Sequence, residues 1–182
     1  MNKARLKIFN PEVLFADEPV VKLGRADIDL LLKKVWKNQR KRIRLCTHKG
    51  ISDKLHEMFI VHTKDTYVRP HKHLNKSESF FILQGKADVV LFDQKGKIKQ
   101  VIEMGDYSSG RKFYYRLAQP FFHSLLIYSK YLIFHEVTNG PFKKSDTIFA
   151  PWSPDINEVL SGKEFTAKLK KQLKKSKIRG KK

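Results

Sequence analysis

The chain has 182 residues, of which 41% are hydrophobic and 12% aromatic, and its formal net charge is +20. This length and composition suit one domain with a core and are too small for two. The single cysteine, Cys46, excludes an internal disulfide and fits a reducing compartment. Charges are scattered through the N-terminus and no run approaches about 18 apolar residues, so we expect a cytoplasmic protein without a signal peptide or membrane span.

The excess of positive charge favours an anionic partner, because clustered lysines release counterions from phosphate backbones. Residues 161–182 carry ten Lys or Arg and one Glu, so this segment contributes +9 of the +20. No groove-reading helix or RNA-stacking motif accompanies the charge, and specific nucleic-acid binding is therefore not expected. Weak attachment at the anionic inner face of a membrane stays open.

The first predicted element is a helix that follows an N-terminal extension, residues 1–24. Over residues 26–42, apolar side chains recur at helical spacing, with acidic residues near the start and basic residues at the end. These apolar residues are Ile28, Leu31, Leu32, Val35 and Trp36. The pattern predicts one amphipathic helix that opens the domain.

Short β-like runs separated by turn residues follow this helix. They are LHEMFIVHT, SFFILQGKADVVLFD, IKQVIEM, FYYRLA, HSLLIYS and YLIFHEVT. Asp93 to Gly96 form a predicted hairpin turn between two of the runs. Many short strands with no helix between them predict a mainly β protein, an antiparallel barrel or sandwich.

The last predicted element is a basic C-terminal tail, residues 156–182. Phe165, Leu169 and Leu173 follow one another at i, i+4 spacing, which predicts a helix with a narrow apolar stripe over part of the tail. We expect the last ten residues to be disordered.

Two histidines in the stretch RPHKHLNKSESFFILQG indicate a metal site. In an extended chain His71 and His73 point the same way, so both imidazoles can face one point inside a barrel. Glu78 follows after four residues and can supply a carboxylate oxygen to that point. His123, at the start of an apolar strand, is the candidate fourth ligand. This donor set suits one divalent transition metal, Fe, Mn, Ni or Zn, without choosing among them.

The spacing of these residues also resembles a known family. His-x-His-x4-Glu-x6-Gly, here His71, His73, Glu78 and Gly85, resembles the first metal-binding motif of the cupin superfamily, and PFFH, ending at His123, resembles the core of the second. Two motif glycines are absent: Asp65 stands six residues before His71, and PFFH replaces Pro-x-Gly.

A closer resemblance is to the WbuC family of cupin fold metalloproteins. It is carried by YVRPHKH, VVLFDQKGKI, HEVTNGPF and FAPWSPD, and it covers about residues 25–155. It implies a cupin-like antiparallel β-barrel (jelly roll) over residues 25–155, with a metal at its centre. It also implies a role in lipopolysaccharide O-antigen or other surface-polysaccharide metabolism, with a small anionic or sugar-derived substrate.

Basic side chains near the histidines are the candidate substrate-binding residues. Arg42, Arg44 and His48 alternate along a predicted strand and share one face, where arginine forks can grip a phosphate or carboxylate. Arg69 has the same parity as His71 and His73, which predicts a substrate clamp beside the metal. The rival interpretation is a solvated basic edge strand.

Several alternatives remain open from the sequence. The protein could be an isomerase, an epimerase or a dioxygenase, or a non-catalytic sensor that binds a metal-chelated ligand. His56 and His62 do not form a zinc-protease motif, since their spacing is six rather than four. Parity does not decide whether His135 or Glu136 faces inward. The oligomeric state also stays open, with a homodimer formed through edge strands as one option.

Overall fold

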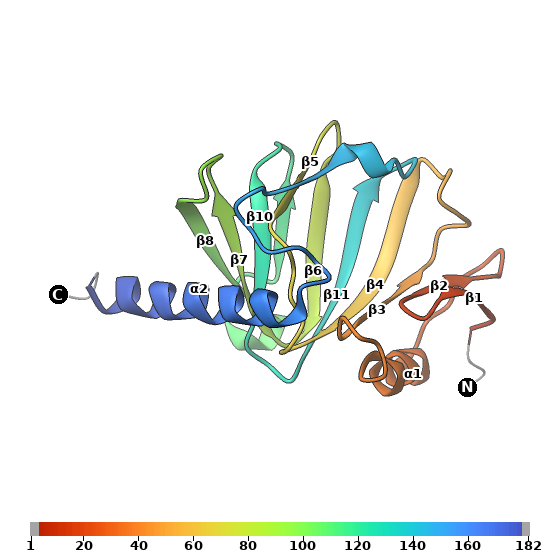
Figure 1. The fold of residues 1–182 in the computed structure, drawn as a ribbon. Coiled ribbons are helices and arrows are strands. Elements are labelled where there is room, and N and C mark those ends of the chain that lie inside the picture. The colour runs from red at the N-terminus through yellow and green to blue at the C-terminus, as the bar shows by residue number, and fades with distance from the viewer. Residues whose placement is uncertain (1–3, 180–182) are drawn as a thin grey trace.

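The computed structural model describes the backbone of residues 4–179 and the side chains of residues 4–175. Two β-sheets face each other and are flanked by two α-helices (Figure 1). The strands in chain order are β1 (Leu6–Asn10), β2 (Val13–Ala16), β3 (Arg42–Cys46), β4 (Leu55–Thr63), β5 (His71–His73), β6 (Glu78–Gln84), β7 (Lys86–Phe92), β8 (Ile98–Gly105), β9 (Tyr114–Leu117), β10 (Phe122–Ile127), β11 (Tyr131–Asn139) and β12 (Thr147–Phe149). The helices are α1 (Arg25–Val35) and α2 (Val159–Arg179), with 3₁₀ turns η1 (Tyr107–Ser109) and η2 (Lys144–Asp146).

The strand order is that of a jelly-roll barrel. The larger sheet has the order β1-β2-β3-β4-β11-β6-β9, and the smaller sheet has the order β12-β5-β10-β7-β8. Every strand pair is antiparallel except β2 with β3. The expected mainly β, cupin-like fold is therefore confirmed. Its division into domains at residues 24/25 and 155/156 stays a prediction.

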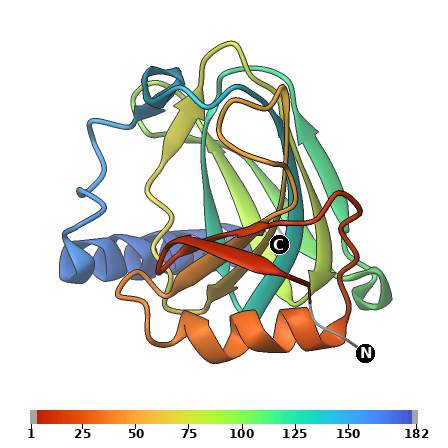
Figure 2. The same ribbon diagram turned by 90° about the vertical axis from the view of Figure 1, so that its right-hand side faces the viewer.

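The β-like runs of the sequence correspond to β4 and to the strands from β6 to β11. Asp93 to Gly96 form the expected turn, in which the Gly96 N–H donates to the carbonyl oxygen of Asp93. The hairpin β1–β2 was not expected, because its strands are short and lie in the segment predicted as an extension. It joins the larger sheet through β3 and lies in front of the other strands in Figure 2.

Helix α1 is shorter than the sequence pattern suggests, and the prediction of a helix up to residue 42 is wrong. It ends at Val35 because the chain must turn to enter β3, and the buried Asn38 side chain donates to the backbone carbonyls of Pro11 and Arg42 within that turn. Leu31 and Val35 pack on Ile43 of the larger sheet. One outer face of the barrel is thereby covered.

Helix α2 is longer than expected, and the prediction of disorder over the last ten residues is wrong up to Arg179. Residues 180–182 lie outside the described residues. The apolar stripe Phe165, Leu169 and Leu173 packs against Phe122 and its neighbours on the smaller sheet. This burial supplies the stability that an isolated lysine-rich helix lacks. In Figure 1 the C-terminal end of α2 extends past the edge of the barrel.

The core that matters for the site lies between the two sheets. Its largest side chains include Phe80, Phe134, Met58 and Met104. Within the described residues, no helix is long and apolar enough to cross a bilayer.

Candidate metal centre

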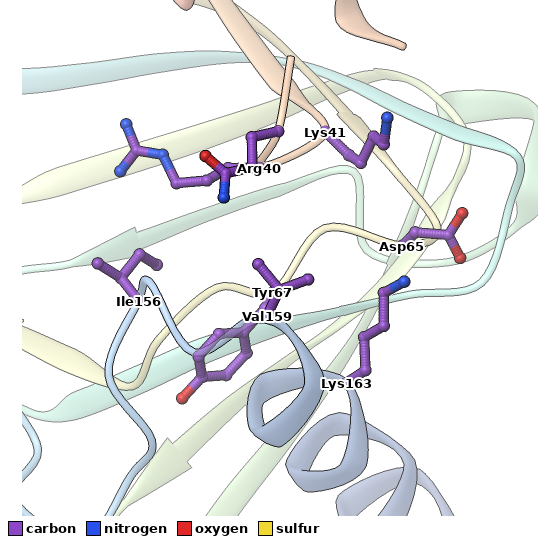
Figure 3. A pocket seen from close by; sticks show the side chains of 8 residues that line it. Arg40, Lys41, Asp65, Tyr67, Ile156, Val159 and Lys163 are labelled. Carbon is purple, nitrogen blue, oxygen red and sulfur yellow. The ribbon is translucent and has the colours of Figure 1, made fainter. Parts of the chain in front are cut away.

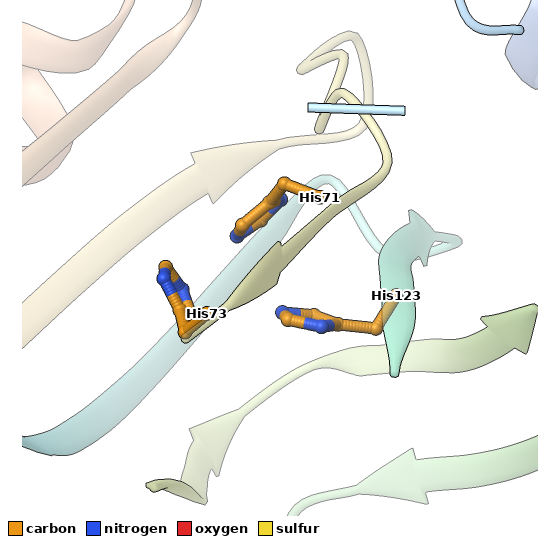
Figure 4. A group of neighbouring side chains, drawn as sticks. All are labelled: His71, His73 and His123. Atoms are coloured by element: carbon orange, nitrogen blue, oxygen red, sulfur yellow. The ribbon is translucent and has the colours of Figure 1, made fainter. Parts of the chain in front are cut away.

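Three histidines from two neighbouring, paired strands converge inside the barrel. His71 and His73 lie on β5 and His123 lies on β10, directly opposite His71 in the strand register. One ring nitrogen of each histidine lies within 4.8 Å of those of the other two. Figure 4 shows the three rings turned toward a common point. His71 and His73 therefore lie on the same face of β5, as the alternation of side chains along a strand predicts.

Hydrogen bonds on the far side of each ring orient the three histidines. Nδ1 of His71 lies 2.8 Å from the backbone oxygen of Arg69, and Nδ1 of His123 lies 3.0 Å from that of Phe121. A carbonyl oxygen only accepts, so each of these Nδ1 atoms carries a proton, and in the neutral ring Nε2 keeps its lone pair. Nδ1 of His73 lies 3.1 Å from Oγ1 of Thr147. Such outer hydrogen bonds are typical of metal-binding histidines.

Glu78, the first residue of β6, brings a buried carboxylate to the same point. Its Oε1 lies 3.0 Å from Nε2 of His123, and its Oε2 lies 3.4 Å from Nε2 of His73. The hydroxyl of Tyr115 donates to Oε1 over 2.8 Å. Glu78 thus lies beside His73 and His123, whereas the ligand atoms that all lie within 4.8 Å of one another in the described residues belong to the three histidines.

The donor geometry fits a shared metal better than a direct hydrogen bond. Nε2 of His123 is buried and has no hydrogen-bond partner of acceptable geometry in the described residues, although Oε1 of Glu78 is only 3.0 Å away. Two ligands bound at right angles about 2.1 Å from one metal would be separated by about 3 Å. Imidazole nitrogens with one carboxylate are ligands that Fe, Mn, Ni and Zn accept.

The protonation of the metal-free site follows from its burial and its charges. Burial alone would lower the pKa of His123, but the carboxylate of Glu78 outweighs it and raises that pKa above its ordinary value. Burial would raise the pKa of Glu78, yet His123 and the hydrogen bonds hold it well below its usual range. Burial lowers the pKa of His71 to about 3, so this ring stays neutral. In the metal-free site these interactions therefore favour the protonated form of His123 and the charged form of Glu78.

Metal affinity should rise with pH, because a metal must displace the proton on Nε2 of His123. At pH values below the raised pKa of His123, this residue releases one proton for each metal bound, and the metal affinity increases about tenfold per pH unit. At pH values above that pKa, His123 no longer makes the metal affinity depend on pH. Calorimetric titration at pH 6, 7 and 8, in buffers of different ionisation enthalpy, counts the protons. The Glu78→Gln variant, which lacks the negative charge, should release fewer at pH 6. No release from the wild type at pH 6 would contradict this protonation scheme.

A cavity of about 260 Å³ adjoins the metal centre at His73. Arg44 and His48, both predicted to bind substrate, line it, as do Lys76 and Glu136. The sequence predicts that Arg44 and Cys46 share the inner face of β3. Cys46 does belong to the core between the sheets, whereas Ile43, on the other face of β3, packs toward α1. The side chain of His48 stacks on His56 with ring centroids 4.1 Å apart.

The other two predicted substrate ligands are engaged elsewhere. Nε of Arg42 lies 3.2 Å from a Glu12 carboxylate oxygen, and NH1 of Arg69 lies 2.6 Å from one of Asp155. The guanidinium of Arg69 also lies over the ring of Phe149. Neither arginine lines the 260 Å³ cavity. Arg69 instead holds the segment after β12 against the barrel.

The structure also settles which residue of β11 faces the barrel interior. Glu136 lines the cavity, whereas His135 packs on Phe59 with ring centroids 4.7 Å apart. Burial, followed by the negative charge of Glu78, raises the pKa of Glu136 to about 8. Glu136 lies opposite Phe80 in the pairing of β11 with β6, and this register is what the sequence alone did not reveal.

A second, smaller cavity of about 130 Å³ lies between the barrel and the start of α2 (Figure 3). Arg40, Lys41, Tyr67 and Lys163 are among its lining residues, and it shares none with the cavity beside the histidines. Arg40 pairs with Glu12, and Nζ of Lys41 donates to the carbonyl of Trp36. We therefore assign it to the packing of α2 on the barrel.

One family model matches part of the chain. Residues 23–104, less than half of the chain, match a family described as a domain of unknown function, DUF6016. No curated protein sequence matches this chain.

Solved structures resemble parts of the chain at low identity. They include a mutant of Bacillus subtilis oxalate decarboxylase OxdC (21% identity, TM-score 0.43, 54% of this chain and 25% of that one). They also include the capsular polysaccharide assembling protein CapF from Staphylococcus aureus (15%, 0.44, 59% and 27%) and the cupin domain of Schizosaccharomyces pombe Cnp3 (15%, 0.41, 56% and 66%). The matched part is less than two thirds of the oxalate decarboxylase and CapF chains. The fold assignment rests on the strand order, and the WbuC resemblance remains a prediction.

Proposed function

We propose that this cupin-like barrel binds one divalent transition metal through His71, His73, Glu78 and His123 and acts on a small molecule in the adjoining cavity. The observation that carries the proposal is the convergence of three histidines, two of which have Nδ1 bonded to a backbone carbonyl so that Nε2 faces the common point. A purely structural cluster would not need the Nδ1 hydrogen bonds of His71 and His123 to turn both Nε2 atoms toward the same place.

Glu136 is the residue best placed to move a proton in this cavity. Because its pKa is about 8, it is protonated at neutral pH in the metal-free protein, and a carboxylic acid that faces a ligand can donate that proton and later recover it. A bound metal of this kind supplies Lewis-acid polarisation of a ligand oxygen, or oxygen chemistry if it is Fe(II). An isomerase, an epimerase or a dioxygenase fits this combination.

The proposal includes a surface-polysaccharide role, with a sugar-derived or other small anionic substrate. The polysaccharide part is supported by the WbuC resemblance alone, whereas the anionic part is also supported by Arg44 and His48 in the cavity wall. A non-catalytic sensor or binding module is the rival, and it predicts tight ligand binding without turnover.

Elemental analysis of protein purified without a metal-chelating tag tests the metal site. We expect nearly one Fe, Mn, Ni or Zn per chain in the wild type and none in His71→Ala/His73→Ala. Lys72→Ala is the matched control, because Lys72 stands between the two histidines but donates to Oε1 of Gln94 and lies over the ring of Phe122. If the wild type holds no metal even after anaerobic reconstitution, the proposal fails.

Helix α2 supports a second candidate function, attachment to an anionic membrane surface. Its exposed side carries Lys163, Lys168, Lys171, Lys174 and Lys175. Its apolar stripe is buried against the barrel, so the helix is not free to insert that stripe into a bilayer. Any attachment would therefore be electrostatic and salt-dependent.

Vesicle sedimentation tests this attachment. At low salt, vesicles in which roughly one phospholipid in three is anionic should bind the wild type, and neutral vesicles should not. Replacing the five exposed lysines of α2 by glutamine should weaken binding at least about a hundredfold, since each basic residue near such a surface contributes about 1 kcal/mol. The His71→Ala/His73→Ala variant should bind as the wild type does. Binding that the lysine variant retains would exclude α2 as the contact.

A further inference from the structure

The cavity beside the metal centre has two chemically different parts. His73 and Glu136 lie where it meets the metal centre, and Arg44 contributes from β3. The remaining wall combines polar side chains with apolar ones from the edge of the larger sheet and from two loops. The apolar ones include Phe9 of β1, Phe15 of β2, Ile51 of the loop after β3, and Phe142 of the loop after β11. With a volume of about 260 Å³, it lies just below the range of about 300–1,000 Å³ typical of drug-sized ligands, and it therefore suits a small molecule.

Arg44 is the cation of this cavity that lacks a carboxylate partner. Within the described residues, no carboxylate oxygen lies within ion-pair distance of its guanidinium, and its side-chain hydrogen bond is a weak one to Sδ of Met58 at 4.0 Å. Its charge also acts on the Glu136 carboxyl group in the same wall, where it lowers the pKa against the effect of burial. Lys76, the other strong cation in the wall, lies 3.5 Å from Asp146 and donates to the carbonyl of Pro141. A single unpaired guanidinium matches a single negative charge, and its planar fork suits a carboxylate.

Three apolar side chains that line the cavity are exposed to solvent. Phe9, Ile51 and Phe142 are 65%, 55% and 51% exposed, although each is large enough to prefer burial. Large exposed apolar groups gathered at one hollow mark a binding surface. These three side chains offer no hydrogen-bonding groups, so an apolar ligand body suits them better than sugar hydroxyls would. The cavity wall also contains polar side chains, among them Asn10, Thr138 and Thr147.

We propose that the cavity binds a small monocarboxylic acid with an apolar body, with the carboxylate on Arg44 and the body against Phe9, Ile51 and Phe142. The inference deepens the proposed function and rests on it only for the claim that the bound acid lies beside a metal. It selects an apolar anion over a sugar as the ligand of the site.

Phenylacetate is a suitable probe, because it combines one carboxylate with one aromatic ring. Calorimetric titration of the metal-loaded full-length protein should show binding of phenylacetate and at least tenfold weaker binding of phenylacetamide, glucuronate and inorganic phosphate. The amide keeps the shape without the charge, glucuronate keeps the carboxylate on a polar body, and phosphate tests for a more highly charged ligand.

Charge-removing variants then locate the carboxylate. Arg44→Gln should weaken phenylacetate binding about 10- to 100-fold, as expected for a hydrogen-bonded charge pair. Arg116→Gln, which removes the same charge from an exposed side chain on β9 outside the cavity, should leave binding unchanged. No phenylacetate binding, equal binding of the amide or glucuronate, tighter binding of phosphate, or equal loss in the two arginine variants would each overturn the proposal.

Metal content measured on the same samples separates this inference from the proposed function. Full metal occupancy in Arg44→Gln with unchanged phenylacetate binding would overturn the ligand proposal and leave the metal site intact. A wild type without metal that still binds phenylacetate through Arg44 would overturn the metal site and support the ligand proposal.

Discussion

Saturating the metal-free protein with its divalent metal should raise the midpoint of thermal unfolding by about 8–16 °C. A ligand that binds only the folded state stabilises it by about 4 kcal/mol at a thousand times its dissociation constant. For a domain of this size, each kcal/mol corresponds to about 2–4 °C. Differential scanning calorimetry with and without metal measures the shift directly. The effect is large because the unfolded chain does not keep His71 and His123 together.

Two histidine variants distinguish this shift from nonspecific metal binding. His123→Ala should abolish it, because the variant removes a buried ligand from the middle of the site. His135→Ala should keep it, since that ring packs on Phe59 away from the cavity. The quantity compared is the shift within each variant, so a lower starting midpoint in His123→Ala does not confuse the result. A full shift in His123→Ala would contradict the assigned ligand set.

Replacing Gly85 with alanine should destabilise the fold by about 3 kcal/mol, through strained backbone and a steric clash together. Gly85 joins β6 to β7 with φ +103°, a conformation that side chains disfavour. A Cβ at this position would also fall well inside van der Waals contact with the backbone oxygen of Tyr131 and with Oγ of Ser129. Tyr131 begins β11 and pairs with Thr63 of β4, so its backbone cannot easily move away. Urea unfolding of the variant measures the loss.

Gly110→Ala is the control that isolates the backbone contribution. Gly110 has φ +70°, but nothing lies within 4 Å of a Cβ built there. We expect a loss of about 1–2 kcal/mol, the cost of a left-handed conformation alone. Equal losses in the two variants would show that the contact with Tyr131 has no energetic consequence.

Much of the metal centre could be predicted because its geometry is local. His71 and His73 share a face because side chains alternate along a strand. Glu78 and Gly85 follow close behind them in the sequence. His123 could be named only as a candidate, from its apolar strand and the resemblance to cupins, since its pairing with His71 joins strands far apart in the chain. The β-like runs were predicted for the same local reason as the histidine pair, because alternation and turn residues act over a few positions.

The ligand cavity could not be predicted in the same way. Arg42, Arg44 and Arg69 look alike in the sequence, yet Glu12 and Asp155 form ion pairs with two of them, and Arg44 has no ion pair among the residues that the structure describes. Those partners come from the hairpin segment and from the chain after β12, both distant in sequence.

The sequence by itself therefore determined the mainly β class, the inward pair of histidines and the apolar stripe of the C-terminal helix, because each depends on a short-range period. Only the tertiary structure decided that Glu136 rather than His135 faces the cavity, that the N-terminal hairpin helps to wall it, and that α2 stays helical to Arg179. Strand register and helix docking depend on the packing of segments far apart in the chain, and no local pattern encodes which segments meet.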